Sequence, residues 1–182
     1  MTARQNGRRD MRGKSLPMAL FLLSMSVVPA ISGKLAYEWY VNVRFAYSIA
    51  YPGEIFMPQE EAANGGGRKF LSRDGKAVAS VYGYDAPENH TLTTVYNETL
   101  SRIKKEDPGW KVTHKSLKDN IFVVRGTNDV MSFRKKVVYK PAERQFVSFE
   151  AIYPASKSAY YDPVVSTMAD TLKMLQGPKI GR

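Results

Sequence analysis

The sequence predicts an α+β fold, an αβα-type sandwich in which an antiparallel sheet of about six to seven strands packs with two main helices. Short segments of alternating apolar and polar residues, several of them joined by turn residues, predict strands in hairpins. Two further segments carry apolar residues at helical spacing. The chain has 182 residues, a length typical of one domain.

The first 32 residues predict a signal peptide, which leaves residues 33–182 as a single α+β domain. A basic start, in which either Met1 or Met11 serves as the first residue, precedes an uncharged apolar run over 16–28. Small residues then allow cleavage after Ala30 or near Ser32. The run is shorter than the roughly 20 apolar residues of a membrane span, so a leader retained as an anchor is the weaker alternative. We therefore expect a periplasmic or secreted protein that contacts the membrane only if the leader stays uncleaved.

Composition excludes several classes of site and partner. The chain has no cysteine, which excludes disulfides, cysteine zinc sites and a thiolate nucleophile. Its formal charge of +10 falls to +6 without the leader, with 22 basic and 16 acidic residues remaining. That excess is modest, and no aromatic residues alternate with the basic ones as platforms for bases. We therefore expect no nucleic-acid partner.

The first half of the expected domain is read as strands. The end of segment 37–51 alternates and predicts one half-buried strand, whereas 54–67 predicts a loop. Segments 68–73 and 76–84 flank Asp74-Gly75, which predicts a hairpin with a type I′ turn.

The second half of the domain is read as helix, four strands and helix. Thr91 is expected to cap a helix over 92–103. Asp162 is expected to cap the last helix with Pro163 at its first position, and Gly177-Pro178 is expected to end it. The four intervening strands are expected at 110–117, 121–127, 130–140 and 144–153. The buried stripe of the last helix is expected to contain Val165, Met168, Leu172 and Leu175.

The start of the expected domain resembles the PsbP-like superfamily of PsbP and DcrB type, and looks closest to uncharacterised exported proteins of proteobacteria. The resemblance rests on the order of elements and on the pattern Tyr40-x-Asn42-x-x-Phe45-x-Tyr47-x-Ile49-x-Tyr51-Pro52. Three further motifs agree with it: Asn64-Gly-Gly-Gly67, Phe70-x-Ser72-x-Asp74-Gly75 and Tyr161-Asp-Pro-Val-Val165. It implies an antiparallel sheet between helices and a protein that binds other proteins. Lipidation of the DcrB type does not carry over, because the cysteine it needs is absent.

Catalytic, cofactor-binding and metal-binding residues are not predicted. Asp85, Glu88 and His90 lie close in sequence, but a solvated polar loop is a simpler interpretation of these residues than a metal site. Ser101 and Lys104 are one helical turn apart, a spacing common on polar helix faces.

Five basic residues instead suggest a face for an anionic partner, because strands paired in chain order would place several of them on one solvent face of the sheet or at its rim. These residues are Arg125, Arg134, Lys136, Lys140 and Arg144. We therefore expect an exported, non-catalytic binding domain that contacts a periplasmic or envelope protein or another envelope component. An immunity-type inhibitor of a toxin and a small hydrolase with a loop-built site remain the alternatives.

Overall fold

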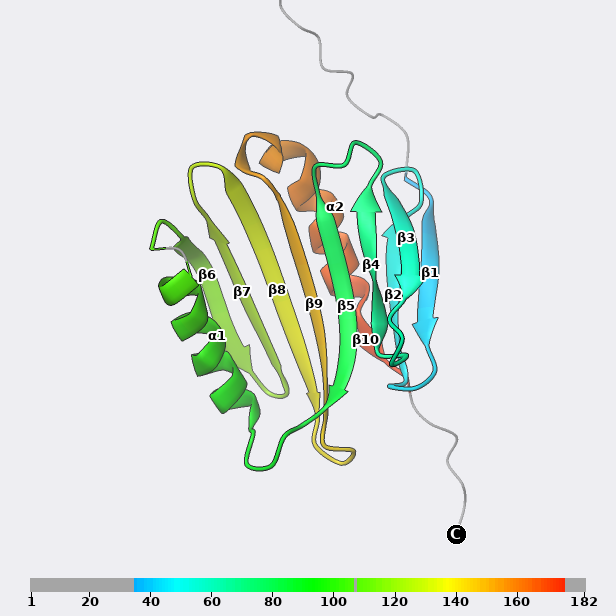
Figure 1. Ribbon diagram of the computed structural model, residues 1–182, viewed down its shortest axis with the longest axis vertical. Helices are drawn as coiled ribbons and strands as arrows, with labels where there is room; N and C mark the ends of the chain where they lie inside the picture. Colours follow the sequence, from blue (N-terminus) through cyan, green and yellow to red (C-terminus); the bar gives the residue numbers. More distant parts are fainter. Residues whose placement is uncertain (1–34, 107, 176–182) are drawn as a thin grey trace, which may run out of the picture. The chain divides into compact units, whose positions relative to one another are not determined.

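The computed structural model describes residues 35–106 and 108–175 (Figure 1), so the expected signal peptide lies outside the described residues. The strands are β1 Tyr37–Asn42, β2 Tyr47–Pro52, β3 Phe56–Glu61, β4 Gly67–Ser72, β5 Val78–Asp85, β6 Lys111–Lys118, β7 Ile121–Thr127, β8 Met131–Lys140, β9 Gln145–Pro154 and β10 Lys173–Met174. The helices are α1 Leu92–Glu106 and α2 Ser158–Thr171, with a short 3-10 turn, Ala155–Lys157, before α2. The expected α+β class and the two main helices are confirmed.

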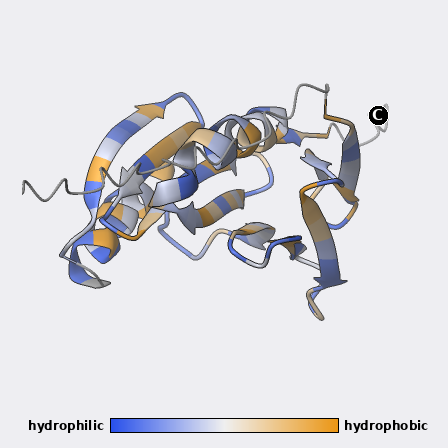
Figure 2. Ribbon diagram, turned by 90° about the horizontal axis from the view of Figure 1, so that it is seen from above, coloured by the Kyte–Doolittle hydropathy of each residue, from blue (hydrophilic) through white to orange (hydrophobic). Residues whose placement is uncertain are grey.

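The strands form two antiparallel sheets. The larger sheet has seven strands in the order β3-β4-β5-β9-β8-β7-β6, and the smaller one has the order β1-β2-β10. Helix α1 packs on one face of the large sheet, while α2 and the small sheet cover the other (Figure 1). Hydrophilic and hydrophobic residues alternate along several strands (Figure 2), as expected when successive side chains point to opposite faces.

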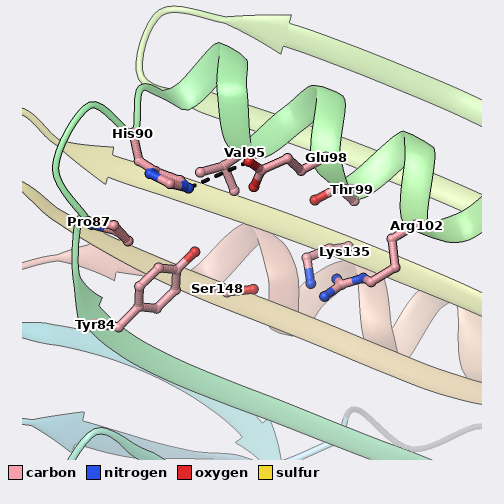
Figure 3. Close-up of a pocket in the computed structure, with 9 residues that line it drawn as sticks. All are labelled: Tyr84, Pro87, His90, Val95, Glu98, Thr99, Arg102, Lys135 and Ser148. Atoms are coloured by element: carbon pink, nitrogen blue, oxygen red, sulfur yellow. Dashed lines mark ion pairs between the residues drawn. The ribbon is translucent and has the colours of Figure 1, made fainter.

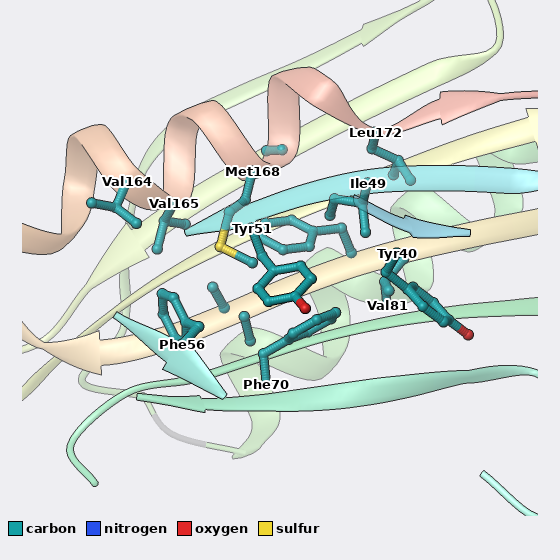
Figure 4. Packing of buried hydrophobic residues seen from close by; sticks show 14 of the residues in the cluster. Tyr40, Ile49, Tyr51, Phe56, Phe70, Val81, Val164, Val165, Met168 and Leu172 are labelled. Atoms are coloured by element: carbon teal, nitrogen blue, oxygen red, sulfur yellow. The ribbon is translucent and has the colours of Figure 1, made fainter. Parts of the chain in front are cut away.

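Each face of the large sheet has its own hydrophobic core. On the α2 face, Ile49 and Tyr51 of β2 pack with Val165 and Met168 of α2 (Figure 4), and Tyr47 belongs to the same cluster. The α1 face holds a smaller cluster of buried residues, with partly buried side chains of α1 packed against it. Its buried members are Leu92, Phe122, Val124, Phe133, Val137 and Phe146.

Two expectations for the first half of the domain are wrong. Residues 37–51 form a hairpin rather than one strand, and β2 is buried on both faces rather than half-buried. The chain turns without glycine or proline, because the Asn42 side chain accepts a hydrogen bond from the Phe45 N–H at 2.8 Å and Ala46 takes a φ of 47°. The expected loop at 54–67 contains β3, an edge strand whose Pro58 and exposed glutamates are typical of sheet edges.

The start of α2 also differs from the expectation. The helix begins at Ser158, so Pro163 lies inside it and Asp162 is not its cap. The Asp162 carboxylate instead accepts a hydrogen bond from the Tyr153 hydroxyl at 2.5 Å. The helix ends at Thr171, and Leu175 follows β10 rather than extending the stripe, while Gly177-Pro178 lies outside the described residues.

The expected hairpin around Asp74-Gly75 is confirmed, but the turn is not type I′, since Gly75 has a φ of 68° and Asp74 has no positive φ. Asp74 instead connects the β4–β5 turn to the start of α2. Its carboxylate accepts hydrogen bonds from the Ser72 hydroxyl, the Lys157 ammonium and the Tyr161 hydroxyl, each at 2.7 Å. Burial alone would raise the pKa of Asp74, yet these hydrogen bonds outweigh it and hold the pKa well below its usual range.

We predict that Asp74→Asn costs about 1–2 kcal/mol at pH 7, because the hydrogen bonds to the charged carboxylate weaken while the site stays partly solvated. A lowered folded-state pKa means that this stabilisation is present above the unfolded pKa of about 3.9 and is lost as pH falls below it. Melting temperatures measured from pH 7 to pH 2 should therefore converge for wild type and variant on acidification. A gap independent of pH would contradict this role for Asp74.

No helix within the described parts of the chain is long and apolar enough to cross a membrane.

Candidate functional site

Two arginines stand directly opposite each other on neighbouring strands of the large sheet. Arg125 of β7 pairs in register with Arg134 of β8. Side chains opposite each other in an antiparallel pair point to the same face, with Cβ atoms about 5 Å apart, and like charges there are destabilising. Both project to the α2 face, since Val138 at the same alternation of β8 belongs to the core beneath α2. The strand pairing thus places two positive charges side by side.

Neither guanidinium is neutralised by a close partner. Arg134 is only 8% exposed, and the Nε atoms of Arg125 and Arg134 are both buried without a hydrogen-bond partner. Among the side chains that the structure describes, no carboxylate lies within 4.0 Å of either guanidinium. Burial, reinforced by the charge of Arg125, lowers the pKa of Arg134. A buried arginine normally has a carboxylate partner, so this pair needs an explanation.

The two arginines line a cavity of about 350 Å³ between the sheet and α2, which we call the arginine pocket. Its wall is rich in hydroxyl groups. The Ser132 hydroxyl lies 3.1 Å from the hydroxyls of both Thr127 and Ser158. Helix α2 contributes Ser158, Asp162 and Ser166, which share one face at i, i+4 and i+8. The lining residues are Thr113, Arg125, Gly126, Thr127, Ser132, Phe133, Arg134, Tyr153, Ser158, Asp162, Pro163 and Ser166.

One carboxylate borders the pocket but leaves a positive excess. Tyr153, Asp170 and Asp162 each raise the pKa of Arg134, opposing part of the effect of burial, but neither carboxylate forms an ion pair with it. Asp162 binds the Tyr153 hydroxyl, and burial together with that hydrogen bond raises the pKa of Tyr153, so the phenol stays protonated. Asp170 is not among the lining residues, so within the lining two guanidinium groups face one carboxylate, and the pocket favours an anion.

The other three basic residues of the expected anionic-partner face lie outside the pocket. The Lys136 ammonium is directed to the end of α2, where it donates to the Ala169 carbonyl at 2.6 Å. Lys140 forms an ion pair with Glu143 at 3.6 Å, and Arg144 is exposed in the β8–β9 turn with a φ of 52°. The structure therefore brings together Arg125 and Arg134 of the expected set, and it covers their face with α2 rather than leaving it open to solvent.

A second cavity, of about 580 Å³, lies on the opposite face of the large sheet beneath α1 (Figure 3). Several of its charged groups are matched to one another. His90 lies 3.5 Å from Glu98, and Lys135 on the sheet forms an ion pair with Glu150 at 2.8 Å in the adjoining hollow. These pairs distinguish the second cavity from the arginine pocket, because their charged groups are already paired with groups of opposite charge and need no ligand to neutralise them.

The residues considered for metal or serine chemistry do not assemble into a site. Asp85 accepts a hydrogen bond from Gln145, and His90 faces Glu98. Ser101 is exposed on α1, and in the described residues no group of three His, Cys, Asp or Glu side chains could hold a metal ion.

The hydroxyl wall of the arginine pocket was missed by sequence reasoning. Its signal was the spacing of Ser158, Asp162 and Ser166, which became visible only once α2 was known to begin before Pro163. The hydroxyls that face α2 come from β7 and β8. These strands are far from α2 in the sequence, so no local pattern places their hydroxyls beside those of the helix.

Comparison with known proteins supports the fold. No family model matches the sequence, and no curated protein matches it. Cyanobacterial PsbP (CyanoP) of Synechocystis superposes with a TM-score of 0.60 at 12% identity, covering 80% of this chain and 96% of that one. The Ran-binding protein Mog1p of Saccharomyces cerevisiae superposes with a TM-score of 0.57 at 8% identity, covering 79% of this chain and 97% of that one. The described chain thus has the PsbP-like α+β fold that its opening motif implied.

Proposed function

We propose that this protein is exported and acts in the periplasm, or outside the cell, as a non-catalytic binding domain for an anionic protein or envelope component. One observation carries the proposal: Arg134 is buried opposite Arg125, and neither has an acidic partner in the described chain. Two charges of one sign placed together without an ion pair cost the fold stability, whereas a ligand of opposite charge would interact favourably with both. The predicted signal peptide over residues 1–32 supports the export part of the proposal.

Support for a binding role also comes from the neighbours with the same fold. Mog1p is described as a Ran-binding protein, so this architecture serves recognition of another protein in at least one case. At 8% identity the likeness carries no residue over, and the proposed contact rests on the arginine pocket alone.

The test begins with the full-length chain expressed in a Gram-negative host. We expect the protein in the osmotic-shock fraction, with an amino terminus that mass spectrometry places after Ala30 or Ser32. An intact amino terminus in the cytosolic fraction would overturn the export part of the proposal.

The binding part is tested with the processed protein and washed envelopes of the same host. Co-sedimentation should fall at least tenfold in Arg125→Gln/Arg134→Gln, while Lys115→Gln, a neutralised lysine of the exposed strand β6, should sediment as the wild type does. Equal sedimentation of the double variant would exclude the arginine pocket as the contact.

A further inference from the structure

We infer that the arginine pocket binds a phosphate group that still carries a proton, presented as a phosphate monoester, so that the anionic partner proposed above is recognised through this group. The inference rests on the proposed function and names the chemistry of the ligand. It follows from the donors in the pocket, from its single carboxylate and from its size.

The donors favour a tetrahedral oxyanion. A guanidinium presents five N–H donors in a planar fork that matches two oxygens of a phosphate at once. Two such forks, on Arg125 and Arg134, approach from the sheet, and the hydroxyls of Ser132 and Ser158 lie on the wall. A carboxylate ligand has only two oxygens and would leave part of this donor set unused, whereas a phosphate has enough oxygens to reach both arginines and the hydroxyls.

The carboxylate of Asp162 favours phosphate over sulfate. One of its oxygens accepts the Tyr153 hydroxyl, and the group is part of the pocket lining. A fully deprotonated oxyanion placed between the arginines would be repelled by this carboxylate. A phosphate monoester has its second pKa near 6, so its protonated form is available close to neutral pH and can donate its hydrogen to Asp162. Sulfate has no such hydrogen at that pH.

The volume favours a group larger than the free ion. The pocket measures about 350 Å³, at the lower end of the range of about 300–1,000 Å³ for small-molecule sites. The Pro163 side chain and the Gly126 backbone supply less polar wall, which suits the carbon part of an ester. The carrier of the phosphate can be a small molecule or the head group of an envelope glycolipid, and both present the same ester.

Isothermal titration of the processed protein at pH 6.5 and low salt tests the inference with four probes: glycerol 3-phosphate, inorganic phosphate, sulfate and acetate. We expect glycerol 3-phosphate to bind at least tenfold tighter than sulfate or acetate, and tighter than inorganic phosphate. Envelope vesicles containing a phosphorylated glycolipid, compared with the dephosphorylated glycolipid, separate a lipid-borne ester from a small soluble one.

The variants assign the binding to named residues. Arg125→Gln and Arg134→Gln should each weaken the binding of glycerol 3-phosphate at least tenfold. Arg134→Lys should recover only part of the lost affinity, because lysine lacks the planar set of donors of a guanidinium. Asp162→Asn should bring the affinity for sulfate to within about threefold of that for phosphate. Lys115→Gln should leave both affinities unchanged. Thermal melts show whether each variant is folded.

Equal binding of sulfate and phosphate by the wild type, or unchanged phosphate binding in Arg134→Gln, would overturn the inference. The two proposals fail separately. If envelope binding needs the arginines but glycerol 3-phosphate does not bind, the ligand class is wrong and the proposed function stands. If the phosphate probes bind as described but the arginine variants still sediment with envelopes, the pocket is a phosphate site and the proposed envelope contact is wrong.

Discussion

Replacing Arg134 by methionine is expected to make the protein more stable. The guanidinium is buried beside the charge of Arg125 without an ion-pair partner, so a side chain of similar length and no charge removes a desolvation cost and a like-charge repulsion. Methionine adapts to irregular space and keeps most of the packing of the arginine stem. We expect a gain of about 1–2 kcal/mol, or roughly 2–8 °C in melting temperature.

Lys135 provides the matched control for this prediction. It is the next residue on β8 and is equally buried at 8% exposure, but it faces α1 and forms an ion pair with Glu150 at 2.8 Å. Lys135→Met leaves that carboxylate without its partner and is expected to lower stability. Calorimetry of both variants decides the matter: if Arg134→Met melts below the wild type, the arginine is compensated in the folded protein and the case for a ligand weakens.

A gain in stability accompanied by a loss of binding is the pattern expected of residues selected for function. Arg134→Met should combine the two effects, since the same side chain causes the cost in the free protein and supplies the donors for the ligand. A ligand that neutralises the pair should therefore raise the melting temperature of the wild type more than that of this variant.

Among the substitutions proposed for this protein, Gly67→Ala is expected to lower the free energy of unfolding most. A Cβ at this position would lie 1.9 Å from the Val81 carbonyl oxygen and 2.6 Å from the Tyr47 hydroxyl. The first of these atoms belongs to the backbone of the neighbouring strand β5, so the strands must separate to admit a methyl group. Tyr47 is fully buried and its hydroxyl bonds the Gly66 carbonyl at 3.0 Å, so the contact between the two sheets is disturbed as well. We expect a cost of about 3–4 kcal/mol.

Gly75→Ala is the control for Gly67→Ala. Gly75 lies in the turn after β4 with a φ of 68°, and a Cβ there would meet no atom within 4 Å. The cost is then only that of the left-handed backbone, about 1 kcal/mol for a non-glycine residue. Denaturant midpoints measured for both variants should differ clearly, and equal midpoints would show that strands β4 and β5 are less closely packed than described.

Local patterns in the sequence predicted most elements of the large sheet. Alternation along β8 placed Arg134 and Lys136 on one face and Phe133 and Val137 on the other, and the cross-strand pairs agree. Thr91 was identified as a helix cap, and its hydroxyl accepts the Thr94 N–H at 3.1 Å. These features depend on neighbours within a few residues, which a single sequence contains.

The features that the sequence did not predict depend on distant partners. Strand β3 carries Pro58 and acidic residues, so its local composition indicated a loop, and only pairing with β4 makes it a strand. Asp162 is a residue type common at helix N-caps, but its carboxylate accepts a hydrogen bond from the Tyr153 hydroxyl. The Tyr161 hydroxyl donates to Asp74, and α2 begins earlier, at Ser158. The basic residues were identified as a group, but the burial of Arg134 follows from the place where α2 packs, which spacing along β8 does not reveal.

The most direct test of the central claim is a crystal structure of the processed protein grown at pH 6.5 with arsenate, a tetrahedral oxyanion that keeps a proton near neutral pH as phosphate does and that anomalous scattering locates without ambiguity. We expect one dominant anomalous peak between the guanidinium groups of Arg125 and Arg134, within hydrogen-bond reach of Ser132 or Ser158, and its disappearance in Arg134→Met. An empty pocket in the wild type, with arsenate bound at surface lysines instead, would contradict the account.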